Sequence, residues 1–179
     1  STFKQVNKYV REDVPVTIYY AFKQSETETK NDVESTASTG WETMLSAIIR
    51  AGFSITGTWP MRTEMANRSI ASGTNALASS IVLVCRKRPE GAPMGTRRDF
   101  VMALKRELHA ALDELRSSNI APVDLAQSAI GPGIGVYSRF SQVLEADGSP
   151  MTVRAALQII NQELDAYFSD QDGELDRES

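Results

Sequence analysis

The sequence predicts an α/β fold, in which the end of a doubly wound, mixed three-stranded sheet is followed by a mainly helical extension. A strand, a helix and a second strand follow one another between residues 16 and 61. Such a unit is almost always a right-handed crossover between parallel strands, whereas a third strand directly after it, at residues 78–85, favours antiparallel pairing. Apolar residues at helical spacing after residue 97 predict the extension.

The first predicted elements are a helix and a strand. Apolar residues at helical spacing predict the last turns of an amphipathic helix over residues 2–11. The β-branched and aromatic run at residues 16–22 lacks strict alternation, which is typical of a central, parallel strand covered on both faces. The polar residues 23–39 cannot bury a core, so we expect a long loop at the carboxyl end of this strand.

The remaining elements of the sheet region extend to residue 88. Apolar spacing over residues 41–52 predicts a helix of about three turns, with Gly52 as its C-terminal cap. Residues 53–61 and 78–85 are the second and third strands. Three strands with one short helix would leave a bare sheet edge, which is a liability for an isolated protein and would also allow self-association.

A linker at residues 89–96, rich in proline and glycine, separates the sheet region from the extension at residues 97–168. Its first helix is predicted over residues 97–116, where large apolar residues share one face. A second helix is predicted over residues 122–130, ended by Gly131-Pro132-Gly133.

A hairpin and a last helix complete the extension. Asp147-Gly148 is a hairpin-type turn, and Thr152 suits the N-cap of a helix that runs to about Phe168. The acidic residues 169–179 contain one large apolar residue and are predicted to be a disordered tail.

Composition limits the classes of function. The chain has 179 residues and a net charge of −4, so any nucleic-acid surface must be local, and basic residues do gather between Arg86 and Arg106. No apolar run approaches the roughly 20 residues that span a bilayer, and the first residues do not resemble a secretory signal. The simplest expectation is a cytoplasmic protein that does not bind membranes.

Few residues suggest chemistry. Cys85 is the single cysteine and lies in an apolar run, so a buried core thiol is favoured. His109 has no carboxylate or cysteine cluster nearby, which favours a packed or solvated helix histidine over a ligand. The glycines at residues 131–135 could cradle a phosphate only between a strand and a helix, so a helix stop is favoured there. No metal-ligand spacing occurs.

Several motifs resemble predicted adenine-specific DNA methyltransferases, which are large bacterial and archaeal proteins described through a domain of unknown function and a zinc ribbon. The likeness covers roughly residues 12–165 and rests on residues 17–25, 40–42, 50–53, 58–64, 75–81, 129–133, 137–139 and 147–148. The resemblance implies a Rossmann-like class I methyltransferase sheet, of which residues 16–22 would be the fifth strand. It places the third strand of this chain between the first two, antiparallel to both.

The resemblance also implies that most of the catalytic machinery lies elsewhere. Such enzymes bind S-adenosylmethionine at a Gly-rich turn after the first strand and act through an Asp/Asn-Pro-Pro-aromatic motif after the fourth. This chain contains neither motif. We therefore expect a fragment without catalytic, cofactor-binding or metal residues, which is silent alone and whose partner is the upstream half of the same protein.

Residues beyond the carboxyl ends of the first two strands are the candidates for DNA contact, because ligands of open α/β sheets bind there. The loops at residues 23–39 and 62–75 follow these ends, and the second is rich in hydrogen-bond donors. The candidates are Arg62, Asn67, Arg68 and Asn75 in that loop, and Arg86, Lys87 and Arg88 at the start of the basic stretch. A solvated loop and a charged linker are the competing interpretations. Trp59 could be a stacking surface, although a core tryptophan is favoured.

The expected function is the C-terminal part of an S-adenosylmethionine-dependent DNA adenine N6-methyltransferase, which completes the sheet and contributes to the DNA side. The alternative is a non-enzymatic protein-interaction module on an α/β scaffold. A methyltransferase acting on RNA or protein is a third candidate.

Overall fold

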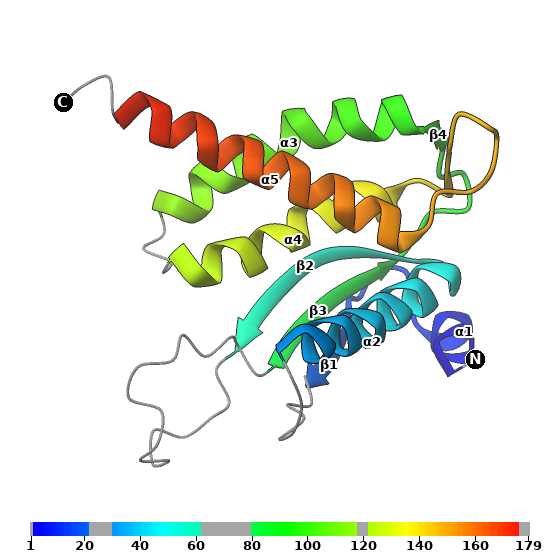
Figure 1. Cartoon of the computed structure of the whole chain (residues 1–179). Helices are drawn as coiled ribbons and strands as arrows, with labels where there is room; N and C mark the ends of the chain where they lie inside the picture. Colours follow the sequence, from blue (N-terminus) through cyan, green and yellow to red (C-terminus); the bar gives the residue numbers. More distant parts are fainter. Residues whose placement is uncertain (1, 22–29, 62–79, 118–121, 176–179) are drawn as a thin grey trace, which may run out of the picture.

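The computed structural model describes residues 2–21, 30–61, 80–117 and 122–175 of a mixed α/β protein (Figure 1). Its elements, in chain order, are α1 (Thr2–Tyr9), β1 (Val16–Ala21), α2 (Lys30–Arg50), β2 (Phe53–Met61), β3 (Ser80–Lys87), β4 (Met94–Thr96), α3 (Arg97–Ser117), α4 (Pro122–Arg139), β5 (Gln142–Leu144) and α5 (Val153–Leu175). Among the described residues, no helix is both long enough and apolar enough to cross a membrane.

Strands β1, β2 and β3 form one sheet in the order β1-β3-β2. Strand β3 is antiparallel to both neighbours, so β1 and β2 run parallel to each other on either side of it. This arrangement confirms the predicted position and direction of the third strand. Leu83 of β3 is paired with Ile18 of β1 and Thr58 of β2, and all three side chains point to the same face.

Strand β1 differs from its prediction. Its side chains alternate between half-buried and exposed positions, and its one partner among the described strands is antiparallel. Tyr19 is 72% exposed, so the prediction of a central strand covered on both faces is wrong for this part of the chain. Tyrosine and threonine are also common on the exposed face of a strand, so the composition of this run did not distinguish a strand covered on one face from one covered on both.

Helix α2 begins at Lys30, so the predicted loop is wrong from that residue onward, while residues 22–29 lie outside the described part. Once a helix is anchored, each further hydrogen bond fixes only one residue, and a polar stretch can extend it. The anchor starts at Trp41, whose ring centroid lies 5.4 Å from that of Tyr20 on β1. A Cβ at Gly40 would lie 3.0 Å from the Tyr20 hydroxyl, so glycine allows this close approach.

Helix α4 continues through Gly131, Pro132 and Gly133 to Arg139, so the predicted helix stop at these residues is wrong. The glycines serve tertiary contacts instead. A Cβ at Gly131 would clash with Thr58 Oγ1, and one at Gly133 would lie 2.7 Å from a methyl carbon of Ile160. Close packing against β2 and α5 therefore compensates for the poor helix propensity of this stretch.

Helix α4 runs along the outer edge of β2, the edge that faces away from β3 (Figure 1). The backbone N–H of Ile55 donates a 2.9 Å hydrogen bond to the Ser138 hydroxyl, where an outer strand would otherwise accept it. A Cβ at Gly135 would lie 3.1 Å from the Ile55 carbonyl oxygen. Small residues thus let the helix lie directly against strand backbone and cover a sheet edge.

Helices α3 and α5 pack on the other side of α4 (Figure 1). The start of α3 is a capping box that sequence analysis missed: Asp99 N–H donates to Thr96 Oγ1, and Thr96 N–H donates to the Asp99 carboxylate over 2.8 Å. These bonds hold the pKa of Asp99 below its ordinary value. The threonine followed three residues later by an acidic side chain was the available signal.

The region between α4 and α5 confirms the predicted turn and cap. Gly148 has φ 80°, and its N–H donates to the Glu145 carbonyl. Thr152 Oγ1 accepts the N–H of Ala155 over 3.1 Å, as an N-cap does. Two features differ: β5 pairs in parallel with β4, which lies within the predicted linker, and α5 continues to Leu175, so the prediction of a disordered tail is wrong for residues 169–175.

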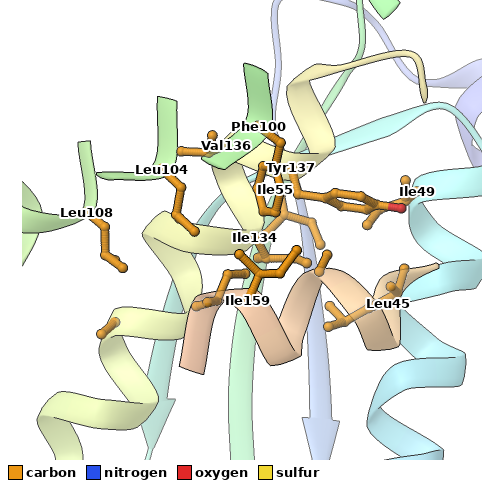
Figure 2. Close-up of a cluster of buried hydrophobic side chains, with 14 of the residues drawn as sticks. Leu45, Ile49, Ile55, Phe100, Leu104, Leu108, Ile134, Val136, Tyr137 and Ile159 are labelled. Atoms are coloured by element: carbon orange, nitrogen blue, oxygen red, sulfur yellow. The ribbon is translucent and has the colours of Figure 1, made fainter. Parts of the chain in front are cut away.

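One hydrophobic core joins the sheet to the helices (Figure 2). Its side chains come chiefly from α2, β2, β3, α3, α4 and α5, with Val143 from β5. Figure 2 labels Leu45, Ile49, Ile55, Phe100, Leu104, Leu108, Ile134, Val136, Tyr137 and Ile159. The predicted sheet region and helical extension therefore bury their apolar residues against each other.

Candidate nucleic-acid interface

The predicted DNA-contact residues fall into two groups. Arg62, Asn67, Arg68 and Asn75 lie outside the described residues. Arg86, Lys87 and Arg88 lie at the end of β3 and directly after it, beside the first residues of β2, because Phe53 is paired with Lys87. The second group therefore lies at the opposite end of the sheet from the carboxyl ends of β1 and β2.

Arg88 is held inside the protein. Its Nη1 donates to the carbonyl oxygens of Ser138 and Phe140 over 3.1 and 3.0 Å, and its Nη2 donates to the Ile49 carbonyl over 2.9 Å. These carbonyls lie at or just beyond the C-terminal ends of α4 and α2, where unpaired carbonyls carry partial negative charge. Arg88 thus caps two helices with one guanidinium.

Burial lowers the pKa of Arg88 from its ordinary value, and the nearby Tyr137 opposes this shift. The guanidinium still carries its charge at neutral pH because its ordinary pKa is so high. The three bonds to backbone give Arg88 an internal, structural role, and its contact with DNA stays a prediction. No spacing in the sequence distinguishes Arg88 from Arg86, since the distinction depends on two helix ends that meet only in the fold.

Arg86 is exposed, and Nη1 of its side chain donates a long, 3.5 Å hydrogen bond to the Asp13 carbonyl. Asp13 itself is paired with Arg11, which lowers the pKa of the Asp13 carboxyl. Arg86 therefore keeps most of its donors directed to solvent and remains available to an anion.

A hollow of about 430 Å³ lies next to Arg88, between α2, the end of α4 and the turn before α5. Arg50, Arg88 and Tyr137 are among its lining residues, and the Tyr137 hydroxyl donates to the Met151 carbonyl over 2.8 Å. A second hollow of about 420 Å³ continues along α2 and is lined by Glu42 and Arg154, which form an ion pair. Ligands of open α/β folds usually bind at the carboxyl ends of the parallel strands. The hollow beside Arg88 lies at the opposite end of the sheet.

Exposed aromatic side chains lie on the sheet face opposite α2. Trp59 is 63% exposed, so the favoured interpretation of a core tryptophan is wrong. Trp59 and Tyr19 are both paired with Val82, one from each side, so they share a face. Both lie two residues before the carboxyl ends of their strands, close to the predicted DNA side.

Cys85 and His109 are packed residues. Cys85 is fully buried, and desolvation raises the pKa of its thiol to about 12, which confirms the predicted core thiol. The His109 ring lies edge-on to Tyr167, with 5.3 Å between centroids, in agreement with a packed histidine. Within the described ranges, no group of three or more His, Cys, Asp or Glu side chains could hold a metal ion.

The described residues do not fit an S-adenosylmethionine site. The one glycine cluster, at residues 131–135, is inside α4, where its backbone is in helical conformation and pressed against Thr58, Ile55 and Ile160. A cofactor-binding turn needs free backbone N–H groups between a strand and a helix.

Comparison of the chain with protein-family models, with curated proteins and with solved structures found no match.

Proposed function

We propose that this chain is the C-terminal part of an S-adenosylmethionine-dependent DNA adenine N6-methyltransferase. It completes the catalytic sheet, contributes to the DNA side and is inactive by itself. The intact protein acts in the cytoplasm, and its upstream half supplies the cofactor site and the catalytic motif.

The observation that carries this proposal is the strand order β1-β3-β2 with an antiparallel strand in the middle. The resemblance to the methyltransferase family implies this order, in which the last strand of the chain's sheet inserts between the two strands before it. A simple strand-helix-strand-strand sequence could equally end in a hairpin at the sheet edge. The insertion therefore supports the family more strongly than the count of elements does.

The outer edge of β1 supports a partner on that side. Among the described strands, β3 is the one neighbour of β1, and no described strand pairs with its outer edge. A strand of the upstream half, parallel to β1, would extend the sheet in the manner of a doubly wound fold. On this proposal the upstream half would lie next to β1, and the DNA side would lie beyond Ala21 and Met61, where Arg62 follows directly in the sequence.

The decisive experiment is methyl transfer by the intact protein, obtained from the native reading frame that includes residues upstream of Ser1. With labelled S-adenosylmethionine, we expect label at N6 of adenine in duplex DNA, and none with this chain alone. The matched control is the intact protein with the Asp or Asn of its Asp/Asn-Pro-Pro-aromatic motif replaced by Ala.

An upstream region without a Gly-rich turn and without that motif would contradict the proposal. Label on RNA or on protein in place of DNA would contradict the choice of substrate. A folded chain that binds another protein but gives no methyl transfer with its upstream half would instead favour the non-enzymatic interaction module.

A further inference from the structure

The face of the sheet opposite α2 carries exposed side chains on all three strands, and they surround Val82, which is 8% exposed, and the partly exposed Val84. We call it the aromatic face and define it by Tyr19, Trp59, Met61, Val82, Val84 and Arg86. Val82 and Val84 alternate along β3 with Ile81, Leu83 and Cys85, which are buried on the side of α2. Tyr19 and Trp59 flank Val82, and are thus separated by two strand spacings, roughly 10 Å.

The aromatic face is open in the described structure. Tyr19, Trp59 and Met61 are 72%, 63% and 43% exposed, whereas the chain's other tryptophan, Trp41, is 8% exposed. The indole nitrogen of Trp59 lies 3.4 Å from the position that a Cβ on Gly57 would take. The glycine thus makes room for the ring to lie back along the strand, with a large surface left toward solvent.

The chemistry of this face fits bases and phosphates. Arg86 is its charged side chain among the described residues, and it lies four residues along β3 from Val82, roughly 13 Å away. No carboxylate shares the face in the described strands. Aromatic rings on a strand surface stack unpaired bases of any identity, and a nearby cation follows the phosphate backbone.

We propose that the aromatic face binds single-stranded nucleic acid, with unpaired bases stacked on Trp59 and Tyr19 and the backbone directed toward Arg86. The choice of nucleic acid as the partner rests on the proposed function. The inference adds a site on this chain, separate from the cofactor site and catalytic motif proposed for the upstream half, and this site would hold a strand that has been separated from its complement.

The chain itself provides the probe, since Trp59 is exposed and Trp41 is buried. Titration of the 179-residue chain with oligothymidylate should quench the emission of Trp59 and leave that of Trp41. Duplex DNA of the same length should quench less, because its bases are already stacked. Binding to a labelled oligonucleotide, measured by anisotropy, should weaken on the order of tenfold in Trp59→Ala and Tyr19→Ser.

Matched variants separate stacking from general effects. Tyr9→Ser removes an equally exposed tyrosine from α1, where it is 76% exposed, and should bind as the unmodified chain does. Arg86→Gln should reduce the salt dependence of binding, whereas Arg98→Gln, at the start of α3, should not. All five substituted positions are exposed, so the folded state should persist in each variant.

Three results would overturn the inference: no quenching by oligothymidylate, equal affinity of the Trp59→Ala and Tyr9→Ser variants, or a Trp59 signal that changes with protein concentration alone. The last result would assign the face to contact between proteins. None of these readouts involves methyl transfer, so the site can fail while the methyltransferase proposal stands, and the reverse.

Discussion

The outer edge of β2 is closed by the chain itself, whereas the outer edge of β1 has no neighbour among the described strands. On the β2 side, Gly131 and Gly135 bring helix α4 against the strand, and Ser138 accepts the N–H of Ile55. On the β1 side, Thr17, Tyr19 and Ala21 are exposed and show ordinary alternation.

This difference shows where the sequence has been constrained by tertiary contact. The closed edge requires particular small and polar residues, because a helix meets strand backbone there. At the open edge no described helix or strand contacts the backbone of β1 in this way, so the sequence there needs only residues that favour a strand. We therefore expect substitutions at the closed edge to lower the free energy of unfolding more than substitutions at the open edge.

The largest effect is expected at Cys85, which is paired with Val16 toward the open edge and with Ile55 toward the closed one. Its pKa of about 12, against an ordinary 9.0, corresponds to about 4 kcal/mol between the two protonation states. A thiol reagent at pH 8 should label native Cys85 slower than the unfolded chain by on the order of a thousandfold. Labelling at the rate of the unfolded chain would show that β1 detaches readily, and it would contradict the contrast drawn between the two edges of the sheet.

The same thiol gives a pH dependence. Because the folded pKa is raised, the unfolded chain loses its proton first as pH rises, so the thiol's contribution to stability is full below pH 9 and declines toward pH 12. Urea unfolding should show a steeper decline in the chain than in Cys85→Ala, because Tyr137 and Tyr167, whose pKa values are also raised, lose their contribution at high pH in both forms.

Next in size is Arg88→Met, which keeps an aliphatic stem and removes all three hydrogen bonds to backbone carbonyls. Carbonyls left without a donor should lower the free energy of unfolding by roughly 3 kcal/mol, measured by urea denaturation. Arg98→Met, at an exposed position of α3, is the control and should change it little. Equal effects of the two would remove the structural role of Arg88.

Gly131→Ala should lower the free energy of unfolding by about 2 kcal/mol, although alanine is the better helix former. The added Cβ meets Thr58 on the closed edge, so α4 must move away from β2. Gly91→Ala is the control, because it adds the same atom where nothing lies within 4 Å. In thermal unfolding, its melting temperature should be close to that of the unmodified chain. A stabilised Gly131→Ala would mean that α4 does not press on the strand.

The smallest effect is expected at the open edge. Tyr19→Thr keeps strand propensity and removes an exposed ring, so the free energy of unfolding should change by less than about 0.5 kcal/mol. A loss comparable to that of Gly131→Ala would show that β1 is already covered in the isolated chain, and the contrast between the edges would disappear.

Sequence reasoning succeeded where the pattern and the final contacts agree. Strand Phe53–Met61, helix Arg97–Ser117 and the cap at Thr152 all have local signals that the fold keeps. It failed where distant contacts override local preference. The Gly-Pro-Gly stretch has the local chemistry of a helix stop, yet the partners of Gly131 and Gly133 are Thr58 and Ile160.

The candidate site was less predictable than the fold. Neighbouring arginines 86 and 88 look alike in sequence, but one is exposed and the other joins two helix ends. For Trp59 the sequence favours a core tryptophan over a stacking surface, because large aromatic side chains are usually buried, yet the side chain is 63% exposed. A single strand pattern gives no information on which face lacks a covering helix.

The position of Arg88 also bears on how the chain can be divided. Its side chain comes from the sheet region, but two of its three acceptors, Ser138 and Phe140, belong to the helical region. Cleavage between residues 88 and 97 would leave the Arg88 charge on one fragment and carbonyl oxygens without their donor on the other. We therefore expect limited proteolysis to yield no stable fragment that ends in this segment, and the two regions to unfold in one cooperative transition.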